Sequence, residues 1–258
     1  MANLVITVMN TVRGWRPWAF GPMFAAVLAI APAQADDALS PNQIGAIEGL
    51  IRNYILAHPE VIVESVQAMR ERDESASHQR AKQNLVALRD QLINDSNSPI
   101  AGNPDGDVTI VEFFDYRCSY CKASLAVVRQ ILEEDPGVRL VFKEFPILSP
   151  ESANAARAAL AAQNQGKYFP FHNALMAARG SFSESQIMEI AAEVGLNINV
   201  LERDMRSQKI QAIIDANTDL AADLNINGTP TFIIGDQVKP GALDIGVLRE
   251  MIAAKRAG

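Results

Sequence analysis

Two patterns of hydrophobic and polar residues divide the chain. Residues 36–98 carry narrow apolar stripes at helical spacing, whereas dense apolar runs begin at Val108. The first stripe has the 3-4-3 spacing of a helix face or coiled-coil seam and consists of Ile44, Ile47, Ile51 and Tyr54. Ser40-Pro41 suits the start of this helix, and Pro59 ends it.

A second helical pattern follows Pro59. Its apolar positions are Val61, Ile62, Val66 and Met69, and residues 70–83 are then almost wholly polar. Leu85, Leu88 and Leu92 restore a stripe before residues 94–107, which read as a loop or hinge. So few helices cannot cover their own apolar stripe. Either residues 36–98 pack on the domain that follows them in the same chain, or they oligomerise, and we favour oligomerisation.

The dense part of the pattern predicts strands alternating with helices. A near-continuous apolar run at 108–115 is typical of a strand covered on both faces. A helix at 118–135 stops at Pro136-Gly137, a second strand covers 138–145, and residues 150–224 read as helices throughout. A hairpin from 231 to 239 and a helix at 242–255 close the order. This order predicts an α/β thioredoxin fold at 99–258 with a helical domain inserted at about 150–224.

The first 35 residues have the pattern of an export signal. Arg13 and Arg16 precede the apolar stretch 18–30, and Ala33-Gln34-Ala35 offers small residues for cleavage. The apolar stretch is short for a membrane span. We therefore interpret residues 1–35 as a cleaved signal peptide and expect a periplasmic protein; the alternative is an uncleaved membrane anchor.

Charge and composition exclude several classes of protein. The whole chain carries −7, and removing the two arginines of the signal gives −7 − 2 = −9 for the mature part. An acidic surface with no basic run argues against nucleic-acid binding. The three histidines are scattered and there are only two cysteines, so we expect no metal site and no cofactor.

The two cysteines belong to one motif, Cys118-Ser119-Tyr120-Cys121, which lies where a predicted strand meets a helix. A disulfide between residues this close removes little chain entropy and is a poor structural staple. The pair suits a two-electron redox centre instead. Cys118 falls at the helix N-terminus, where backbone N–H groups favour a thiolate, so we assign Cys118 as nucleophile and Cys121 as resolving thiol. The alternative is a redox-inert buried pair.

The chain resembles the DsbA-like branch of the thioredoxin superfamily over about residues 100–256. The resemblance rests on the Cys-x-x-Cys context, on Phe145-Pro146, on the helical insertion and on the run 228–232, Gly-Thr-Pro-Thr-Phe. It implies that Thr229-Pro230 is a cis-proline loop facing the cysteines and pairing with substrate, where the alternative is an ordinary trans turn.

The resemblance also implies two tuning residues. Glu112 is a charge within an apolar strand, and in DsbA-like proteins a glutamate here lies beneath the cysteines and moves protons. Lys143 on the next strand would be its partner, unless it is merely an exposed strand-end lysine.

Three features resemble the isomerase members of this branch rather than the oxidases. They are Tyr120 in the loop, Thr229 before the proline, and residues 51–62, which resemble the N-terminal region of ScsC-type proteins that form trimers. The resemblance thus implies a homotrimeric disulfide isomerase or reductase. It would act on unfolded or misoxidised secreted proteins and be kept reduced by a membrane redox partner. The alternatives are a DsbA-type dithiol oxidase and a chaperone-like binding module with a vestigial redox site.

Overall fold

The computed structural model describes residues 39–257 and divides the chain into two compact units, the first ending at Pro59 and the second beginning at Glu60. The predicted signal peptide, residues 1–35, lies outside the described residues. Within the described part, no helix is both long and apolar enough to cross a membrane.

Helix α1 (Pro41–Ala57) is the described helix of the first unit. Its start is fixed by a capping box, in which the Ser40 side chain accepts from the Gln43 backbone N–H and the Gln43 side chain accepts from the Ser40 N–H. None of its residues is buried. The apolar stripe predicted from the sequence is exposed, with fractional exposures of 43% to 54% at Ile44, Ile47, Ile51 and Tyr54.

The second unit contains five strands and nine helices within its described residues. The strands are β1 (Ile100–Gly102), β2 (Val108–Phe114), β3 (Val138–Glu144), β4 (Thr231–Ile234) and β5 (Gln237–Pro240). The helices are α2 (Glu60–Ala87), α3 (Arg89–Ile93), α4 (Ser119–Glu134), α5 (Pro150–Gln163), α6 (Tyr168–Ala177), α7 (Glu184–Glu193), α8 (Ile198–Met205), α9 (Gln208–Asp223) and α10 (Ile245–Ala257).

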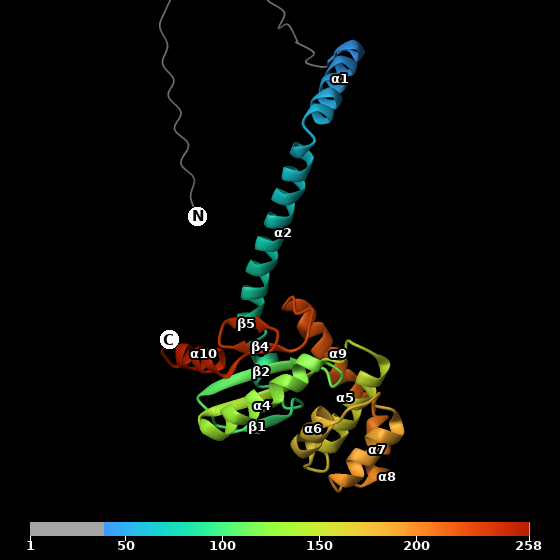
Figure 1. Cartoon of the computed structure of the whole chain (residues 1–258), viewed down its shortest axis with the longest axis vertical. Helices are drawn as coiled ribbons and strands as arrows, with labels where there is room; N and C mark the ends of the chain where they lie inside the picture. Colours follow the sequence, from blue (N-terminus) through green and yellow to red (C-terminus); the bar gives the residue numbers. More distant parts are fainter. Residues whose placement is uncertain (1–38, 258) are drawn as a thin grey trace, which may run out of the picture. The chain divides into compact units, whose positions relative to one another are not determined.

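The sheet has the order β1-β3-β2-β4-β5, with β2 and β3 parallel and the other neighbours antiparallel. Because β2 lies in the centre and is covered on both faces, six of its seven residues are buried. One face packs against α4 and α10, and the other against α3, α9 and the end of α2. Helices α6, α7 and α8 gather in a group beside the sheet (Figure 1). This is the predicted thioredoxin fold with its helical insertion.

One part of the sequence prediction changes, and the structure adds a second detail. Residues 94–107 are not simply a loop, because Ile100–Gly102 form the edge strand β1 against β3. The polar run 70–83 is helical, since α2 continues through it from Glu60 to Ala87. Leu85 and Leu92 then pack on the sheet. A three-residue strand and a polar helix both lack the apolar periodicity that reveals longer amphipathic elements.

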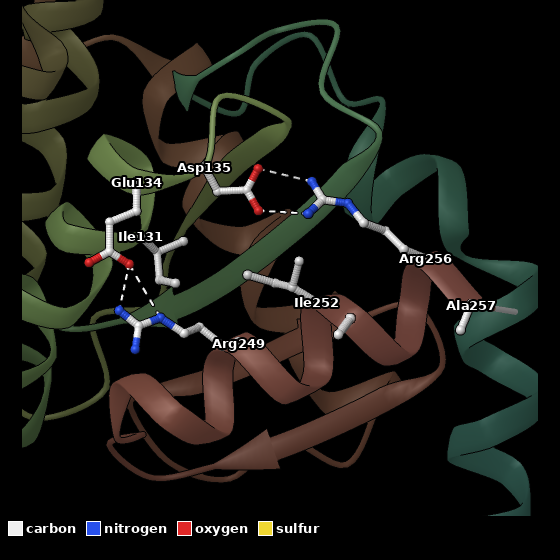
Figure 2. A pocket seen from close by; sticks show the side chains of 8 residues that line it. Ile131, Glu134, Asp135, Arg249, Ile252, Arg256 and Ala257 are labelled. Atoms are coloured by element: carbon white, nitrogen blue, oxygen red, sulfur yellow. Dashed lines mark hydrogen bonds and ion pairs between the residues drawn. The ribbon is translucent and has the colours of Figure 1, made fainter.

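Ion pairs fasten α10 to the end of α4. Arg249 binds Glu134 at 2.6 Å, and Arg256 binds Asp135 at 2.7 Å, both beside a pocket of about 580 Å³ (Figure 2). Arg256 also bridges to Asp107 before β2. These contacts lie at the C-terminal end of α4, whereas the cysteines lie at its N-terminal end, so this pocket is separate from the redox motif.

Candidate active site

Cys118 is the N-cap of α4, at the point where the chain leaves the carboxyl end of β2. Its Sγ accepts a hydrogen bond from the Cys121 backbone N–H at 3.3 Å and lies 3.2 Å from the carbonyl oxygen of Thr229. The Cys118 N–H donates to the Asp115 carbonyl at 3.1 Å, which fixes the turn before the helix. Both cysteines are free thiols. The arrangement presents one sulfur to a helix N-terminus and to a facing loop.

The two sulfurs have opposite acidities. A hydrogen bond from the Cys121 thiol, the nearby Thr229 and the backbone N–H groups of Cys121 and Tyr120 lower the pKa of Cys118 to about 6, although its burial works against them. Burial raises the pKa of Cys121 well above its usual value, because its sulfur lies one turn inside the helix. At neutral pH the Cys118 thiolate is therefore available while Cys121 holds its proton.

Thr229 and Pro230 face Cys118 from the loop before β4. Their peptide bond is cis, as the resemblance implies. The Pro230 carbonyl accepts from the Gly241 N–H at 2.7 Å, and the Thr231 hydroxyl donates to the Gly228 carbonyl, so both sides of the loop are held. Ser119 and Tyr120 stand at the opening of α4 with exposed side chains. The structure thus places Thr229 beside Cys118, with Ser119 and Tyr120 next to Cys118 in the chain and Pro230 next to Thr229.

Glu112 lies on the central strand, opposite Phe142 on β3 and Phe232 on β4. Only 4% of it is exposed. Burial, and then the negative charge of Cys118, raise the pKa of this carboxyl to about 8. Glu112 is therefore mostly protonated at neutral pH and can exchange a proton when a nearby thiolate forms or disappears.

Lys143 is not the partner of Glu112, contrary to the expectation from the sequence. In the parallel register Lys143 lies opposite Phe113, so its side chain points to the other face of the sheet. There its Nζ donates to the Gln91 carbonyl at 2.6 Å and the Ser98 hydroxyl at 2.7 Å, and it pairs with Asp95 at 3.3 Å. Lys143 ties the segment between α3 and β1 to the sheet, away from the cysteines.

Sequence reasoning missed two groups of polar residues around the motif. Asp115 is buried, and its carboxylate accepts from the backbone N–H groups of Arg117 and Leu148 and from the Ser152 hydroxyl. A second group lies deeper and consists of Tyr116, Glu144, Tyr168 and His172. The one available signal was Glu144, a second acidic residue at the end of a buried strand. Among the described residues, no three His, Cys, Asp or Glu side chains are placed to hold a metal ion.

Two family models match the chain. The model of the DSBA-like thioredoxin domain matches residues 109–253, more than half of the chain. The model of the copper resistance protein ScsC N-terminal domain matches residues 45–76, which include most of α1 and the first part of α2.

Solved structures and curated relatives are also similar to parts of the chain. A thioredoxin-like oxidoreductase from Silicibacter pomeroyi DSS-3 is 47% identical with a TM-score of 0.65, covering 66% of this chain and 98% of that one. A Proteus mirabilis ScsC with a linker deletion is 25% identical with a TM-score of 0.65, covering 86% and 99%. The Na(+)/H(+) antiporter NhaA 1 of Salinispora arenicola is 27% identical over 161 residues, 62% of this chain. The chain spans about a quarter of the length of the curated relatives it matches.

Replacing Lys143 should cost stability but not redox activity. In Lys143→Met the Gln91 carbonyl and the Ser98 hydroxyl lose a buried donor, so the free energy of unfolding should fall by about 2 kcal/mol. Urea unfolding measures this change. The exposed Lys239→Met is the control, and it should change stability by less than about 0.5 kcal/mol. A loss of disulfide exchange in folded Lys143→Met would contradict its placement on the far face.

Replacing Glu112 should change how stability depends on pH. Between its ordinary pKa of 4.5 and its folded pKa of about 8, the unfolded chain has released the Glu112 proton and the folded chain keeps it. This residue's contribution is therefore fully present below pH 4.5 and is lost as pH rises toward 8. Relative to wild type, Glu112→Gln should gain at least about 2 kcal/mol between pH 5 and pH 8, measured by urea unfolding with excess reductant. An equal difference at both pH values would show that Glu112 is not held protonated.

Proposed function

Because the chain belongs to the DsbA-like thioredoxin family of thiol–disulfide oxidoreductases, we propose that it is an exported disulfide isomerase or reductase that uses Cys118 and Cys121. One observation carries the proposal: the Cys118 sulfur lies at a helix N-terminus, with a pKa of about 6, 3.2 Å from the Thr229 carbonyl. This arrangement places a nucleophilic thiolate, Cys118, beside the backbone of Thr229, with which an extended substrate segment can pair.

The first chemical step needs only the Cys118 thiolate. It attacks one sulfur of a substrate disulfide, so that a Cys118–substrate disulfide forms, the substrate S–S bond breaks, and the other substrate sulfur leaves as a thiolate. In isomerisation the released substrate thiolate attacks a second substrate disulfide, which forms a new bond and frees another substrate thiolate. That thiolate attacks the substrate sulfur of the mixed disulfide, so that a new substrate disulfide forms and Cys118 leaves as a thiolate. In reduction Cys121 loses its proton, with Glu112 as the proposed acceptor when it is ionised, and attacks Cys118 to free the substrate. The resulting Cys118–Cys121 disulfide is then reduced by a membrane dithiol partner.

Substrate binding is proposed at the rim of this site. The Thr229 N–H and C=O would pair with an extended substrate segment, as in strand addition. Three large apolar side chains are exposed, Tyr120 at 67% in the motif itself, and Ile147 at 42% and Leu148 at 53% in the loop between β3 and α5. Asp115 holds the Leu148 backbone, so this part of the rim is fixed. Exposed apolar side chains next to a thiolate favour unfolded or misoxidised proteins as substrates.

The first unit supports the isomerase side of the proposal. An isomerase must keep hold of a misfolded substrate, and several active sites in one assembly make this possible. The α1 stripe is apolar, exposed and without a buried residue, and residues 45–76 match the ScsC N-terminal domain. We therefore propose a homo-oligomer, a trimer, formed through α1. Residues 1–35 are proposed as the signal peptide that delivers the protein to the periplasm.

Cysteine variants test the chemical roles. Cys118→Ser should abolish disulfide exchange, whereas Cys121→Ser should accumulate a mixed disulfide on Cys118, because the resolving thiol is gone. Mass spectrometry of the protein mixed with a disulfide-containing peptide detects this adduct. Ser119→Ala, which leaves both sulfurs in place, is the control and should exchange without accumulating the adduct. An adduct on Cys121 in Cys118→Ser would reverse the assignment.

A charge on the α1 stripe tests the oligomer. Ile47→Asp should give a folded monomer, because each apolar side chain buried in an interface contributes roughly 1.5–3 kcal/mol and a carboxylate cannot be buried there unpaired. Light scattering gives the mass, and refolding of scrambled ribonuclease gives the isomerase rate. Asn53→Asp adds the same charge on the opposite side of the helix and should keep both.

The monomeric variant separates the two activities. Ile47→Asp should still reduce a small peptide disulfide at the wild-type rate while losing isomerisation of scrambled ribonuclease. A variant that stays oligomeric, or a monomer that isomerises at the full rate, would refute the proposed role of α1. Rapid oxidation of reduced ribonuclease without isomerisation in wild type would instead favour a dithiol oxidase.

A further inference from the structure

Behind the redox motif lies a buried polar cluster that the proposed chemistry does not use. Glu144 ends β3 and is 1% exposed. Its Oε1 accepts hydrogen bonds from the Tyr116 hydroxyl at 3.0 Å and from the Tyr168 hydroxyl at 2.8 Å. Its Oε2 is buried without a hydrogen-bond partner among the described residues. One oxygen of this carboxyl group accepts two hydrogen bonds and the other accepts none, which is unusual for a buried polar group and needs an explanation.

The hydrogen-bond directions in the cluster define one arrangement of protons. The Tyr116 hydroxyl donates to Glu144, so its oxygen is free to accept from His172 Nδ1, 3.1 Å away. This assigns the Nδ1–H tautomer to His172. Burial lowers the pKa of His172 to about 3, so the ring is neutral. His172 therefore supplies a hydrogen bond but no positive charge.

No cation within the described residues contacts the Glu144 carboxyl. The groups that face it are Tyr116 and the acidic Asp115 from the β2–α4 turn, and Tyr168 from α6. Burial raises the pKa of Glu144 well above its usual value; the hydrogen bonds from Tyr168 and Tyr116 act against this rise, and the negative charge of Asp115 adds to it. An unpaired buried carboxylate is far more costly than a neutral acid, so burial favours the uncharged form of Glu144.

The cluster holds the turn that carries Cys118. Tyr116 lies two residues before Cys118, and the Phe145 N–H next to Glu144 donates to the Phe114 carbonyl at 2.9 Å. The Cys118 N–H in turn donates to the Asp115 carbonyl. The Tyr116 side chain is thus an anchor of this turn on its buried side, in addition to the Asp115 carboxylate, and Glu144 is the acceptor that fixes the Tyr116 hydroxyl.

We propose that Glu144 is a positioning residue for Cys118: by accepting the hydrogen bond of the Tyr116 hydroxyl, its carboxyl group fixes the turn that carries the reactive sulfur. This role rests on the proposed function. The consequence concerns one short contact of Cys118 Sγ, the hydrogen bond that it accepts from the Cys121 N–H at 3.3 Å. A turn released from its anchor lengthens this contact and weakens the stabilisation of the thiolate.

The experiment measures the pKa of Cys118 from the pH dependence of its alkylation rate in the full-length reduced protein. Glu144→Leu and Tyr116→Phe should each raise this pKa by at least about half a unit, which is about threefold in the acid dissociation constant. The double variant should shift the pKa no further than Glu144→Leu alone, because both changes remove the same anchor. Glu144→Gln keeps a neutral acceptor oxygen and should restore the wild-type value.

Tyr168→Phe is the matched control. It removes a hydrogen bond to the same Oε1 atom from another buried tyrosine, but Tyr168 belongs to α6 and not to the Cys118 turn. It should lower the free energy of unfolding as Tyr116→Phe does, while leaving the pKa of Cys118 within about 0.2 units of wild type. If Glu144→Leu fails to fold, Tyr116→Phe against Tyr168→Phe still decides the matter.

Two results would overturn this role of Glu144. Equal losses of stability with an unchanged Cys118 pKa would make the cluster ordinary core packing. A shift in Glu144→Gln as large as in Glu144→Leu would mean that the charge of Glu144 matters and not its acceptor oxygen. Failure of the proposed function is seen separately, as a wild-type protein with the expected Cys118 pKa that does not exchange with a peptide disulfide.

Discussion

A sulfur can hold negative charge inside a protein only where hydrogen-bond donors point at it, and the site depends on this constraint. Cys118 meets it as the N-cap of α4, where the Cys121 thiol and N–H both face its Sγ. That position exists because β2 is a buried central strand that ends directly before α4. The ion pairs of α10 fasten the opposite end of α4. The sheet and its covering helices therefore hold the Cys118 sulfur in a fixed position.

The core behind the Cys118 sulfur contains ionisable groups. Among the described residues, no oppositely charged side chain on this face of the sheet contacts them. Glu112 and Glu144 have raised pKa values and His172 a lowered one, in each case mainly through burial. In all three, burial therefore favours the neutral form. A neutral acid behind a thiolate does not oppose its charge, whereas an ionised one would. The same burial that makes these groups costly to ionise thus protects the acidity of Cys118.

The sequence predicted the elements well, because the strands and most helices carry clear periodicity and the cysteines lie between two of them. It also predicted that Cys118, Cys121, Thr229 and Pro230 meet. It failed at Lys143, since a one-residue difference in strand register moves a side chain to the other face, and apolar runs buried on both faces do not reveal register. The Glu144 cluster was missed because its members are far apart in the chain and of ordinary residue types. Only the fold brings Tyr168 and His172 of α6 under the Cys118 turn.

The contrast between the two cysteines bears on the choice between reduction and isomerisation. A thiol of low pKa leaves a mixed disulfide readily, so Cys118 is easily displaced by any thiolate that reaches it. Cys121 is buried and rarely ionised, so its attack is slow unless a base removes its proton. Glu112 lies near both sulfurs, but with a pKa of about 8 it is mostly protonated at neutral pH and accepts protons only in its minor form. A mixed disulfide that Cys121 resolves slowly leaves time for a second substrate thiol to attack, and this is the physical reason for placing isomerisation before reduction in the proposed function.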